Sequence, residues 1–490
     1  MIKFKFYSTV VLTLWGMNVV SQTIQSVRDE LVSLSADKDL KNASIGFYAI
    51  DLTTNKIIAG LSPNTSLVPA STNKLVTTAS ALEILGQQTR FSTQILYTGK
   101  LDTLKRVLYG DIIIKGGGDP CLGSYRYEKY YEGFINNWAS KIKALKIDSI
   151  TGRVIADASY FTHQMIPSTW IWGDLGNYYG SGPNGLSIYE NMCRVEFHSG
   201  KKQGDTTYVS CVNPYIPELN IDNKVVSMDI KKDESYFYGA PYDPYRMVKG
   251  GIPINKKEFE VKSSIPDPAL LTAFELDMEL RGMGIKIGNV YTTKRRLGVG
   301  QLPTKKMQLI TKTYSPKVSS IVKQTNTYSV NLYAEHLLNQ IGVKSYKSGD
   351  PESGTTAITE FWRKKGIDVD GFYMNDGSGL SRFNVLTARQ LVLILRYMKN
   401  SDNYPAFYRS LPIAGKTGTI KSIGRKTVAE NNLRAKSGYM TRVRSYAGYV
   451  TTQSKRKIAF AMIVNNYNCS PYEMKKKMEK VMVKLAEIND

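Results

Sequence analysis

The chain has 490 residues, of which 42% are hydrophobic and 22% charged, a balance typical of a folded globular protein rather than a disordered or collagen-like one. The length predicts two or three domains, and beyond residue 22 no uninterrupted run of about 18 apolar residues occurs, which excludes a multispan membrane protein. The 65 basic and 42 acidic residues give a net charge of +23, which favours anionic surroundings such as a phospholipid surface or an acidic cell-wall polymer.

The first 22 residues have the layout of a secretory signal peptide. Lys3 and Lys5 precede an apolar run from Tyr7 to Val20, and the small Ser21 follows. A buried first helix or a retained anchor is the alternative. We expect an exported, periplasmic protein without a lipid anchor, since no cysteine lies near the cleavage point. Export and the scattered basic residues argue against nucleic acid as a partner and leave peripheral contact with membrane or cell wall open.

The next segment predicts a helix, then strands, then a second helix. Helical periodicity from Thr23 gives way to strand patterns over residues 45–59, and a helix is expected over residues 71–85, where Gly86 supplies a stop. Residues 91–305 differ, because short alternating strands and turn-rich aromatic segments replace the helical pattern. This middle stretch is predicted to be a separate module.

Helical periodicity returns after Met307, and three strands and a final helix follow it. The predicted helices cover residues 319–340 and 387–399, and the predicted strands cover residues 433–440, 445–451 and 457–465. In the last helix, lysines surround an apolar stripe of Met474, Met478, Val481 and Leu485. We expect this stripe to pack on a sheet rather than on a membrane surface.

The cysteines and histidines do not form a ligand set. Cys121, Cys193, Cys211 and Cys469 show no paired close spacing, and only three histidines accompany them. We therefore expect neither a metal nor a cofactor. In an oxidising compartment Cys193 and Cys211 could bridge a hairpin, and two free thiols are an equal alternative.

Ser71 and Lys74 are the first candidates for catalysis. A lysine three residues after a serine at the start of a helix lies on the same face, so its amine reaches the hydroxyl. The pair works as nucleophile and base only where burial or a neighbouring cation brings the lysine pKa down toward neutrality. Ser-x-x-Lys occurs six times in this chain. Ser71 stands out because Pro69-Ala70 precede it, a buried stripe follows it, and helix N-terminal N–H groups can stabilise an oxyanion there.

Around Ser71 and Lys74 the sequence resembles the penicillin-recognising serine transferases, whose signature continues with Ser-x-Asn and Lys-[Ser/Thr]-Gly. Two candidates exist for each later motif. Ser401-Asp402-Asn403 and Lys416-Thr417-Gly418 have the more familiar spellings, but their first residues are only 15 positions apart. That is too few to connect a cleft-side loop with a central strand, so we expect a helix-terminating turn and a surface connection there.

The second pair of motifs fits the predicted architecture. Ser329-Val330-Asn331 and Lys436-Ser437-Gly438 begin 107 positions apart. The latter lies in a predicted strand that two more strands and the last helix follow. We therefore expect this pair to complete the site.

Further stretches narrow the resemblance. They are Pro69–Leu75, Gly116–Pro120, Gly173–Leu175, Tyr179–Gly180, Asp376–Arg382, Leu411–Gly415 and Arg434–Gly438. Through them nearly the whole mature chain resembles the D-Ala-D-Ala carboxypeptidases of the DacB (penicillin-binding protein 4) type, peptidase family S13. In that family inserted domains separate the nucleophile from the second motif, as the 258 positions between Ser71 and Ser329 would here.

The resemblance implies a multi-domain α/β (α+β) fold. A serine β-lactamase-like or transpeptidase-like domain, with an antiparallel sheet flanked by helices, would carry inserted mainly-β domains. The expected divisions are 1–22, signal peptide; 23–92 and 305–490, transpeptidase-like catalytic domain; 93–170 and 245–304, inserted domain II; 171–244, nested inserted domain III.

The resemblance also implies roles for the residues. Ser71 would attack the carbonyl between the last two D-alanines of a peptidoglycan stem peptide and form an acyl-enzyme, while Lys74 takes its proton. Ser329 would pass a proton to the leaving amine, and Asn331 would hold the acyl chain. Lys436 would bring positive charge to the substrate carboxylate and help keep Lys74 neutral.

The strand residues after Lys436 would complete the site. Ser437 would donate to the substrate carboxylate, and Gly438 would let the substrate backbone lie against the strand. The backbone N–H groups of Ser71 and Tyr439 would form the oxyanion hole.

The implied activity is that of a serine-type D-Ala-D-Ala carboxypeptidase, with DD-endopeptidase activity through the same acyl-enzyme and with β-lactam antibiotics as inhibitors. A serine β-lactamase-like hydrolase is an alternative, but Lys364–Ile367 offers no glutamate to position a deacylating water. A Ser-His-Asp hydrolase centred on Ser378 lacks the Gly-x-Ser-x-Gly context. A non-catalytic cell-wall-binding scaffold is the remaining alternative, which the complete set of side chains disfavours.

Overall fold

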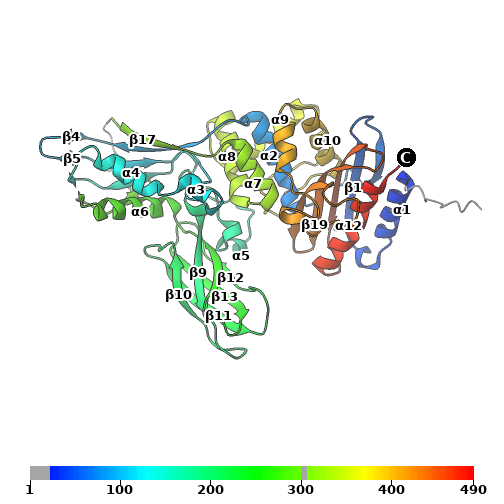
Figure 1. Ribbon diagram of the computed structural model, residues 1–490, viewed down its shortest axis with the longest axis horizontal. Coiled ribbons are helices and arrows are strands. Elements are labelled where there is room, and N and C mark those ends of the chain that lie inside the picture. Colours follow the sequence, from blue (N-terminus) through cyan, green and yellow to red (C-terminus); the bar gives the residue numbers. More distant parts are fainter. Residues whose placement is uncertain (1–22, 299–305) are drawn as a thin grey trace, which may run out of the picture.

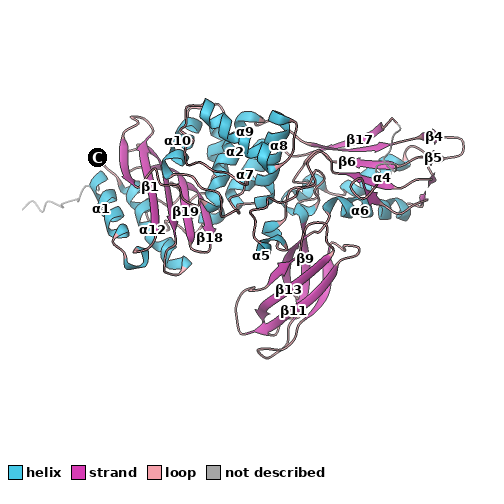
Figure 2. Ribbon diagram, turned by 180° about the vertical axis from the view of Figure 1, so that it is seen from behind, coloured by secondary structure: helices cyan, strands magenta, loops and turns pink. Residues whose placement is uncertain are grey.

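The computed structural model describes residues 23–298 and 306–490, so the signal-peptide prediction for residues 1–22 lies outside the described residues. Three units make up the molecule (Figure 1; Figure 2). A terminal unit holds α1 and the C-terminus, an inserted unit lies at the opposite end, and a small nested unit projects from the side between them. Within the described ranges no helix is both long and apolar enough to cross a bilayer.

The terminal unit is built on a five-stranded antiparallel sheet with the order β18-β19-β20-β1-β2. Its first strands in the sequence therefore pair with its last ones, and Ser44 lies opposite Asn465. The strands are β1 (Ser44–Asp51), β2 (Ile57–Leu61), β18 (Arg434–Met440), β19 (Val443–Thr451) and β20 (Lys457–Asn465). The three strands expected near the C-terminus are confirmed.

Helices cover both faces of this sheet (Figure 1). On one face lie α1 (Ile24–Ser35) and α12 (Pro471–Glu487). On the other, α10 (Ala388–Lys399) packs on β1 and β20, and it is joined by further helices, α2 (Asn73–Ile84), α7 (Val318–Tyr328), α8 (Asn331–Tyr346), α9 (Pro351–Lys364) and α11 (Tyr404–Ser410), which pack on one another. The apolar stripe of α12, including Met474 and Leu485, is fully buried in a core with sheet residues such as Phe460. This helix packs on the sheet, as predicted.

The inserted unit combines two sheets with helices. The sheets have the orders β16-β8-β6-β3-β17 and β15-β7-β5-β4. Its strands are β3 (Ser92–Tyr97), β4 (Lys100–Asp102), β5 (Val107–Tyr109), β6 (Ile112–Lys115), β7 (Ser149–Ile150), β8 (Val154–Asp157), β15 (Lys286–Ile287), β16 (Thr292–Thr293) and β17 (Gln308–Tyr314). Its helices are α3 (Glu128–Tyr131), α4 (Phe134–Lys143) and α6 (Pro268–Gly282). Because α4 and α6 pack against each other and α6 packs on β8, this unit is mixed α/β rather than mainly β.

The nested unit is mainly β, as expected. It holds two three-stranded sheets, with the orders β10-β9-β14 and β11-β13-β12. Its elements are α5 (Trp172–Leu175), β9 (Met192–His198), β10 (Tyr208–Asn213), β11 (Asn220–Met228), β12 (Tyr236–Tyr238), β13 (Tyr245–Pro253) and β14 (Phe259–Ser264).

The cysteines of the nested unit do not bridge. Cys193 and Cys211 lie on neighbouring strands, but the register places Cys211 opposite Glu196 and Cys193 opposite Ser263 of β14. All four cysteines are in the described part of the chain and carry free thiols. Of the two open alternatives, the structure therefore has the free thiols, with Cys193 buried and Cys211 exposed.

Strand pairing places two boundaries differently from the sequence prediction. β17 pairs with β3 of the inserted unit, so the inserted sheet runs to Tyr314, past the predicted boundary at residue 305. β13 and β14 pair with β11 and β9, so residues 245–264 lie in the nested sheets rather than in the 245–304 segment assigned to domain II. The cause is long-range backbone hydrogen bonding, which local periodicity does not report.

Candidate active site

Ser71 lies in a 3₁₀ turn, Ala70–Thr72, and α2 begins two residues later, at Asn73, rather than at Ser71 as predicted. Ala70 has a φ of 46°, in the left-handed region that residues with a Cβ rarely adopt. The Thr72 hydroxyl donates to the Pro69 carbonyl at 2.8 Å, and the Ser445 hydroxyl of β19 donates to the same oxygen at 2.5 Å. The turn that carries Ser71 is thus fixed to the central sheet.

Lys74 is completely buried beside Ser71. Its Nζ lies 3.0 Å from Ser71 Oγ and donates to Asn331 Oδ1 and to the Ser378 carbonyl, each at 2.6 Å. Burial lowers the pKa of Lys74 to about 7, against the opposing pull of the Asp376 and Glu335 carboxylates. The amine therefore has the depressed pKa that a proton acceptor needs near neutral pH.

The Ser329 motif sits at a break between two helices. The sequence predicted one helix over residues 319–340, but α7 ends at Tyr328 and Ser329 has a φ of 61°. Ser329 Oγ accepts a hydrogen bond from Lys436 Nζ at 2.9 Å. Asn331 begins α8, accepts from Lys74, and donates through Nδ2 to the Tyr179 carbonyl at 2.8 Å. The break brings the hydroxyl into contact with Lys436 and the amide into contact with Lys74, the partner of Ser71.

The residues of β18 form the opposite wall. Lys436 is completely buried and donates to the Ser437 carbonyl at 2.5 Å as well as to Ser329. Burial, and then the nearby Lys74, lower the pKa of Lys436. The Ser437 hydroxyl donates to Thr419 Oγ1 at 2.8 Å. Tyr439 is exposed at the end of this wall.

Gly438 lies tightly against the turn that carries Ser71. A Cβ on Gly438 would lie 2.2 Å from Ser445 Oγ, 2.6 Å from the Pro69 carbonyl and 3.0 Å from the Ser71 nitrogen. The missing side chain therefore makes room for the turn that carries Ser71, and the predicted contact with the substrate backbone stays a prediction. Its position against the Ser71 nitrogen shows how closely β18 approaches that turn.

The loop behind Lys74 was missed as a functional element. Besides the Ser378 carbonyl, it presents the N–H groups of Gly377 and Ser378 to the buried Glu335 carboxylate at 2.9 and 2.7 Å. Burial and the nearby Asp376 raise the pKa of Glu335. The Asp376–Arg382 stretch was noticed in the sequence, but a backbone carbonyl that accepts from a distant lysine leaves no side-chain signal.

The two rejected motifs lie elsewhere. Ser401 and the Asn403 amide both donate to the Glu83 carboxylate, in the turn between α10 and α11. Lys416 is exposed, and the Thr417 hydroxyl accepts from the nearby Ile413 N–H at 2.8 Å. In the part of the chain that the structure describes, neither motif makes a hydrogen bond with Ser71 or Lys74.

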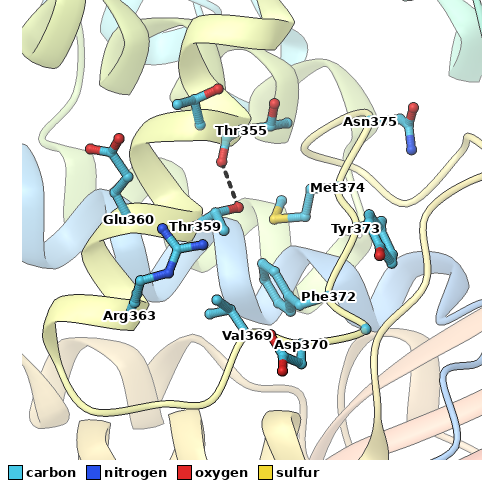
Figure 3. A pocket seen from close by; sticks show the side chains of 12 residues that line it. Thr355, Thr359, Glu360, Arg363, Val369, Asp370, Phe372, Tyr373, Met374 and Asn375 are labelled. Carbon is cyan, nitrogen blue, oxygen red and sulfur yellow. Dashed lines mark hydrogen bonds between the residues drawn. The ribbon is translucent and has the colours of Figure 1, made fainter.

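A separate hollow of about 600 Å³ lies between α9 and residues 369–375 (Figure 3). Thr355, Thr359 and Arg363 line it from the helix, and Phe372 and Tyr373 line it from the loop. None of the site residues predicted from the sequence lines this hollow. The candidate site is defined instead by the buried polar contacts of Lys74 and Lys436.

The arrangement contains the groups needed to acylate a serine and to pass its proton to a leaving group. A hydroxyl lies beside a buried amine, a second serine and lysine lie across the cleft, and an amide lies between them. Fold and geometry together are those of a serine-type hydrolase. Residues 27–488 match the family described as D-Ala-D-Ala carboxypeptidase 3 (S13), and the chain belongs to this family.

Relatives are similar over most of the chain. The D-alanyl-D-alanine carboxypeptidase DacB of Haemophilus influenzae is 26% identical over 470 residues, covering 94% of this chain and 93% of the relative. A D-alanyl-D-alanine carboxypeptidase of Actinomadura sp. is 25% identical over 479 residues, covering 95% and 85%. The crystal structure of penicillin-binding protein 4 (DacB) from Haemophilus influenzae matches with a TM-score of 0.77 at 25% identity, covering 94% of this chain and 97% of that one. The predicted family and fold class are confirmed.

Proposed function

We propose that the protein is a serine-type D-Ala-D-Ala carboxypeptidase that acts on peptidoglycan stem peptides, with Ser71 as the nucleophile. The observation that carries the proposal is the buried Lys74 amine, 3.0 Å from Ser71 Oγ and with a pKa lowered to about 7. Family membership supplies the substrate class.

The contacts of Lys74 support its role as the proton acceptor. A neutral amine has two hydrogens and one lone pair. Both hydrogens have acceptors at 2.6 Å, the Asn331 amide oxygen and the Ser378 carbonyl. The lone pair is then left for the Ser71 hydroxyl, which donates its proton as Oγ attacks the peptide carbonyl.

The far wall supports release of D-alanine. Ser329 Oγ, held by Lys436, is the group that hands a proton to the leaving amine. The negative charge of the substrate's terminal carboxylate would raise the pKa of the buried Lys436, which burial and Lys74 lower in the free protein. Ser437 would donate to the same carboxylate, Asn331 would hold the acyl chain, and the N–H groups of Ser71 and Tyr439 would bind the oxyanion.

Cleavage of cross-linked peptides would use the same acyl-enzyme with a longer leaving group. β18 is an edge strand of its sheet, so its outer side can receive an extended peptide. We expect β-lactams to acylate Ser71, because they react through the same acyl-enzyme chemistry.

Export to the periplasm is proposed from the signal-peptide pattern of residues 1–22. We also propose that the terminal, inserted and nested units are three domains.

Labelling with a fluorescent penicillin tests the proposal. We expect the wild-type protein and Ser401→Ala to be labelled and Ser71→Ala to remain dark. Incubation with purified muropeptides then shows which bond is cut. Release of D-alanine from monomeric muropeptides indicates carboxypeptidase activity, and loss of the cross-link from cross-linked muropeptides indicates endopeptidase activity. Labelling of Ser71→Ala to the wild-type level would overturn the assignment of the nucleophile.

A further inference from the structure

An aromatic and cationic surface begins directly beside the reaction centre. We call it the tyrosine platform. The rings of Tyr125, Tyr178 and Tyr328 are 44%, 50% and 53% exposed. The platform consists of these three tyrosines and the cations between them, Arg126, Arg194 and Lys262.

One end of the platform starts at the Ser329 motif, because Tyr328 directly precedes Ser329. The Arg126 guanidinium lies 5.1 Å from the centre of the Tyr328 ring and 4.7 Å from that of Tyr125, so the two ring centres are less than 10 Å apart. An ion pair with the buried Glu190 at 3.2 Å fixes Arg126 in this position. Tyr125 is therefore held close to Tyr328, the residue before Ser329.

The other end returns to Asn331. Arg194 and Lys262, on strands of the nested unit, lie 5.7 and 5.9 Å from the Tyr125 ring, and Lys262 is also 5.9 Å from the Tyr178 ring. Tyr178 precedes Tyr179, whose carbonyl accepts from Asn331. The platform is thus connected to the Ser71 cleft on two sides.

A groove of about 470 Å³ continues the platform between the inserted and nested units. Tyr125 and Arg194 of the platform line it, and Tyr189, Tyr215 and Asn213 are among its other lining residues. Its volume lies in the range of small-ligand sites, of about 300–1,000 Å³. Aromatic rings with a few planar polar groups suit a ligand that has flat apolar faces and polar edges.

The charges on the platform nearly balance. Glu260 pairs with Arg194 at 3.0 Å and with Lys262 at 4.0 Å, and Glu190 pairs with Arg126. Burial raises the pKa of Glu275 in the groove, where the Tyr189 hydroxyl donates to it at 2.6 Å. A balanced surface favours a ligand that is mostly uncharged over a polyanion.

We propose that the tyrosine platform and its groove bind the N-acetylated disaccharide from which the stem peptide hangs. This inference rests on the proposed function, because the peptide end must lie at Ser71. Four residues of a pentapeptide lie between the sugar and the scissile bond, and fully extended they span about 14 Å, so the sugar would lie beyond Ser71 on a neighbouring surface such as the platform. The sugar rings stack on the exposed tyrosines, and the cations contact the acetamido and peptide carbonyls.

Steady-state kinetics with two substrates test the platform: a disaccharide pentapeptide and the same pentapeptide without sugars. We expect Tyr125→Ala and Arg194→Ala to raise the KM for the sugar-bearing substrate about 5- to 30-fold, with kcat unchanged. KM for the free pentapeptide and the rate of penicillin acylation stay at the wild-type level. Tyr125→Phe keeps the ring and most of the affinity. Matched controls are Tyr109→Ala, an exposed ring on β5, and Arg106→Ala, whose exposed ion pair with Asp148 lies in the inserted unit.

Two results would overturn the inference: an unchanged KM for the sugar-bearing substrate, or an equal rise for both substrates, which marks a merely structural role. Should the wild-type protein release D-alanine from neither substrate, the proposed function fails by itself. Calorimetry then tests the binding role of the platform without turnover, by comparing the affinity of the disaccharide pentapeptide for Ser71→Ala with its affinity for the double variant Ser71→Ala, Tyr125→Ala. Equal affinities reject it, and a 5- to 30-fold loss supports it.

Discussion

Lys74 is completely buried near two carboxylates, and the desolvation of its amine outweighs their attraction. Because the base is the neutral amine, its active fraction grows as pH rises through a pKa of about 7. We expect the second-order rate constant for penicillin acylation to rise about tenfold per pH unit well below that pKa and to level off above it. Stopped-flow acylation between pH 5 and 9 measures it, and a rate that falls over this range would contradict the assignment of Lys74 as the base.

The two lysine motifs differ in burial, and this difference predicts different effects. Lys436 is completely buried and donates to Ser329, whereas Lys416 is exposed. We expect Lys436→Ala to slow acylation at least about a hundredfold and Lys416→Ala to change it by less than about twofold. The same fluorescent penicillin assay checks both variants. If Lys416→Ala greatly slowed acylation and Lys436→Ala did not, Lys416 rather than Lys436 would be the lysine of the active site.

Ser329 combines the hydroxyl that we propose passes a proton to the leaving amine with a left-handed backbone. Ser329→Gly and Ser329→Ala both remove the hydroxyl, so we expect both to slow turnover to a similar extent. Glycine accepts a φ of 61° freely, whereas alanine keeps the strain, so the glycine variant should unfold with a free energy about 1 kcal/mol higher than the alanine variant. Urea unfolding compares the two, and retained turnover in either variant would remove Ser329 from the proton path.

The sequence predicted the side chains that surround Lys74 and Lys436 better than the backbone groups that contact them. Ser71, Lys74, Ser329 and Lys436 were predicted because their spacing and residue types are distinctive, and the structure pairs Ser71 with Lys74 and Ser329 with Lys436. The Ser378 carbonyl was not found, since any residue has a carbonyl and only the fold aims this one at Lys74.

Among the elements, β18 can lie close to the turn that carries Ser71 only because Gly438 has no side chain. Gly438→Ala would push β18 away from the turn that carries Ser71, because the new Cβ lies 2.2 Å from Ser445 Oγ and 2.6 Å from the Pro69 carbonyl. We expect it to cost about 1–3 kcal/mol of stability and to lower the acylation rate at least about tenfold. Gly60→Ala on the edge strand β2 is the control, since its Cβ meets nothing closer than 3.7 Å. Thermal unfolding and penicillin labelling test both, and equal effects at the two positions would refute this account of Gly438.

The elements of the terminal unit were predictable where periodicity is long, as in α10 and the three C-terminal strands. The break at Ser329 was not, because the pattern of apolar residues runs through it and the interruption serves contacts with Lys436, far away in sequence. The sequence also did not predict to which unit β13, β14 and β17 belong, because these strands pair with strands far away in the sequence.

For the whole molecule, net charge predicts behaviour that no single residue does. With a net charge of +23, we expect the Ser71→Ala protein to cosediment with purified acidic cell-wall polymer at about 50 mM salt and to be released as salt rises to about 500 mM, because counter-ions screen the attraction. Retention that does not depend on salt would place the binding in specific contacts instead.

The pairing of β1 with β20 joins the two ends of the polypeptide, from Ser44 opposite Asn465 to Asp51 opposite Ile458. The central sheet therefore closes only after more than nine-tenths of the chain has been synthesised, and contacts of such sequence separation form slowly. A nascent chain that ends before β20 carries Ser71, the proposed nucleophile, but lacks the strand that completes the sheet behind β18 and β19. Cutting of the wall, and capture by an antibiotic, can begin only with the finished molecule.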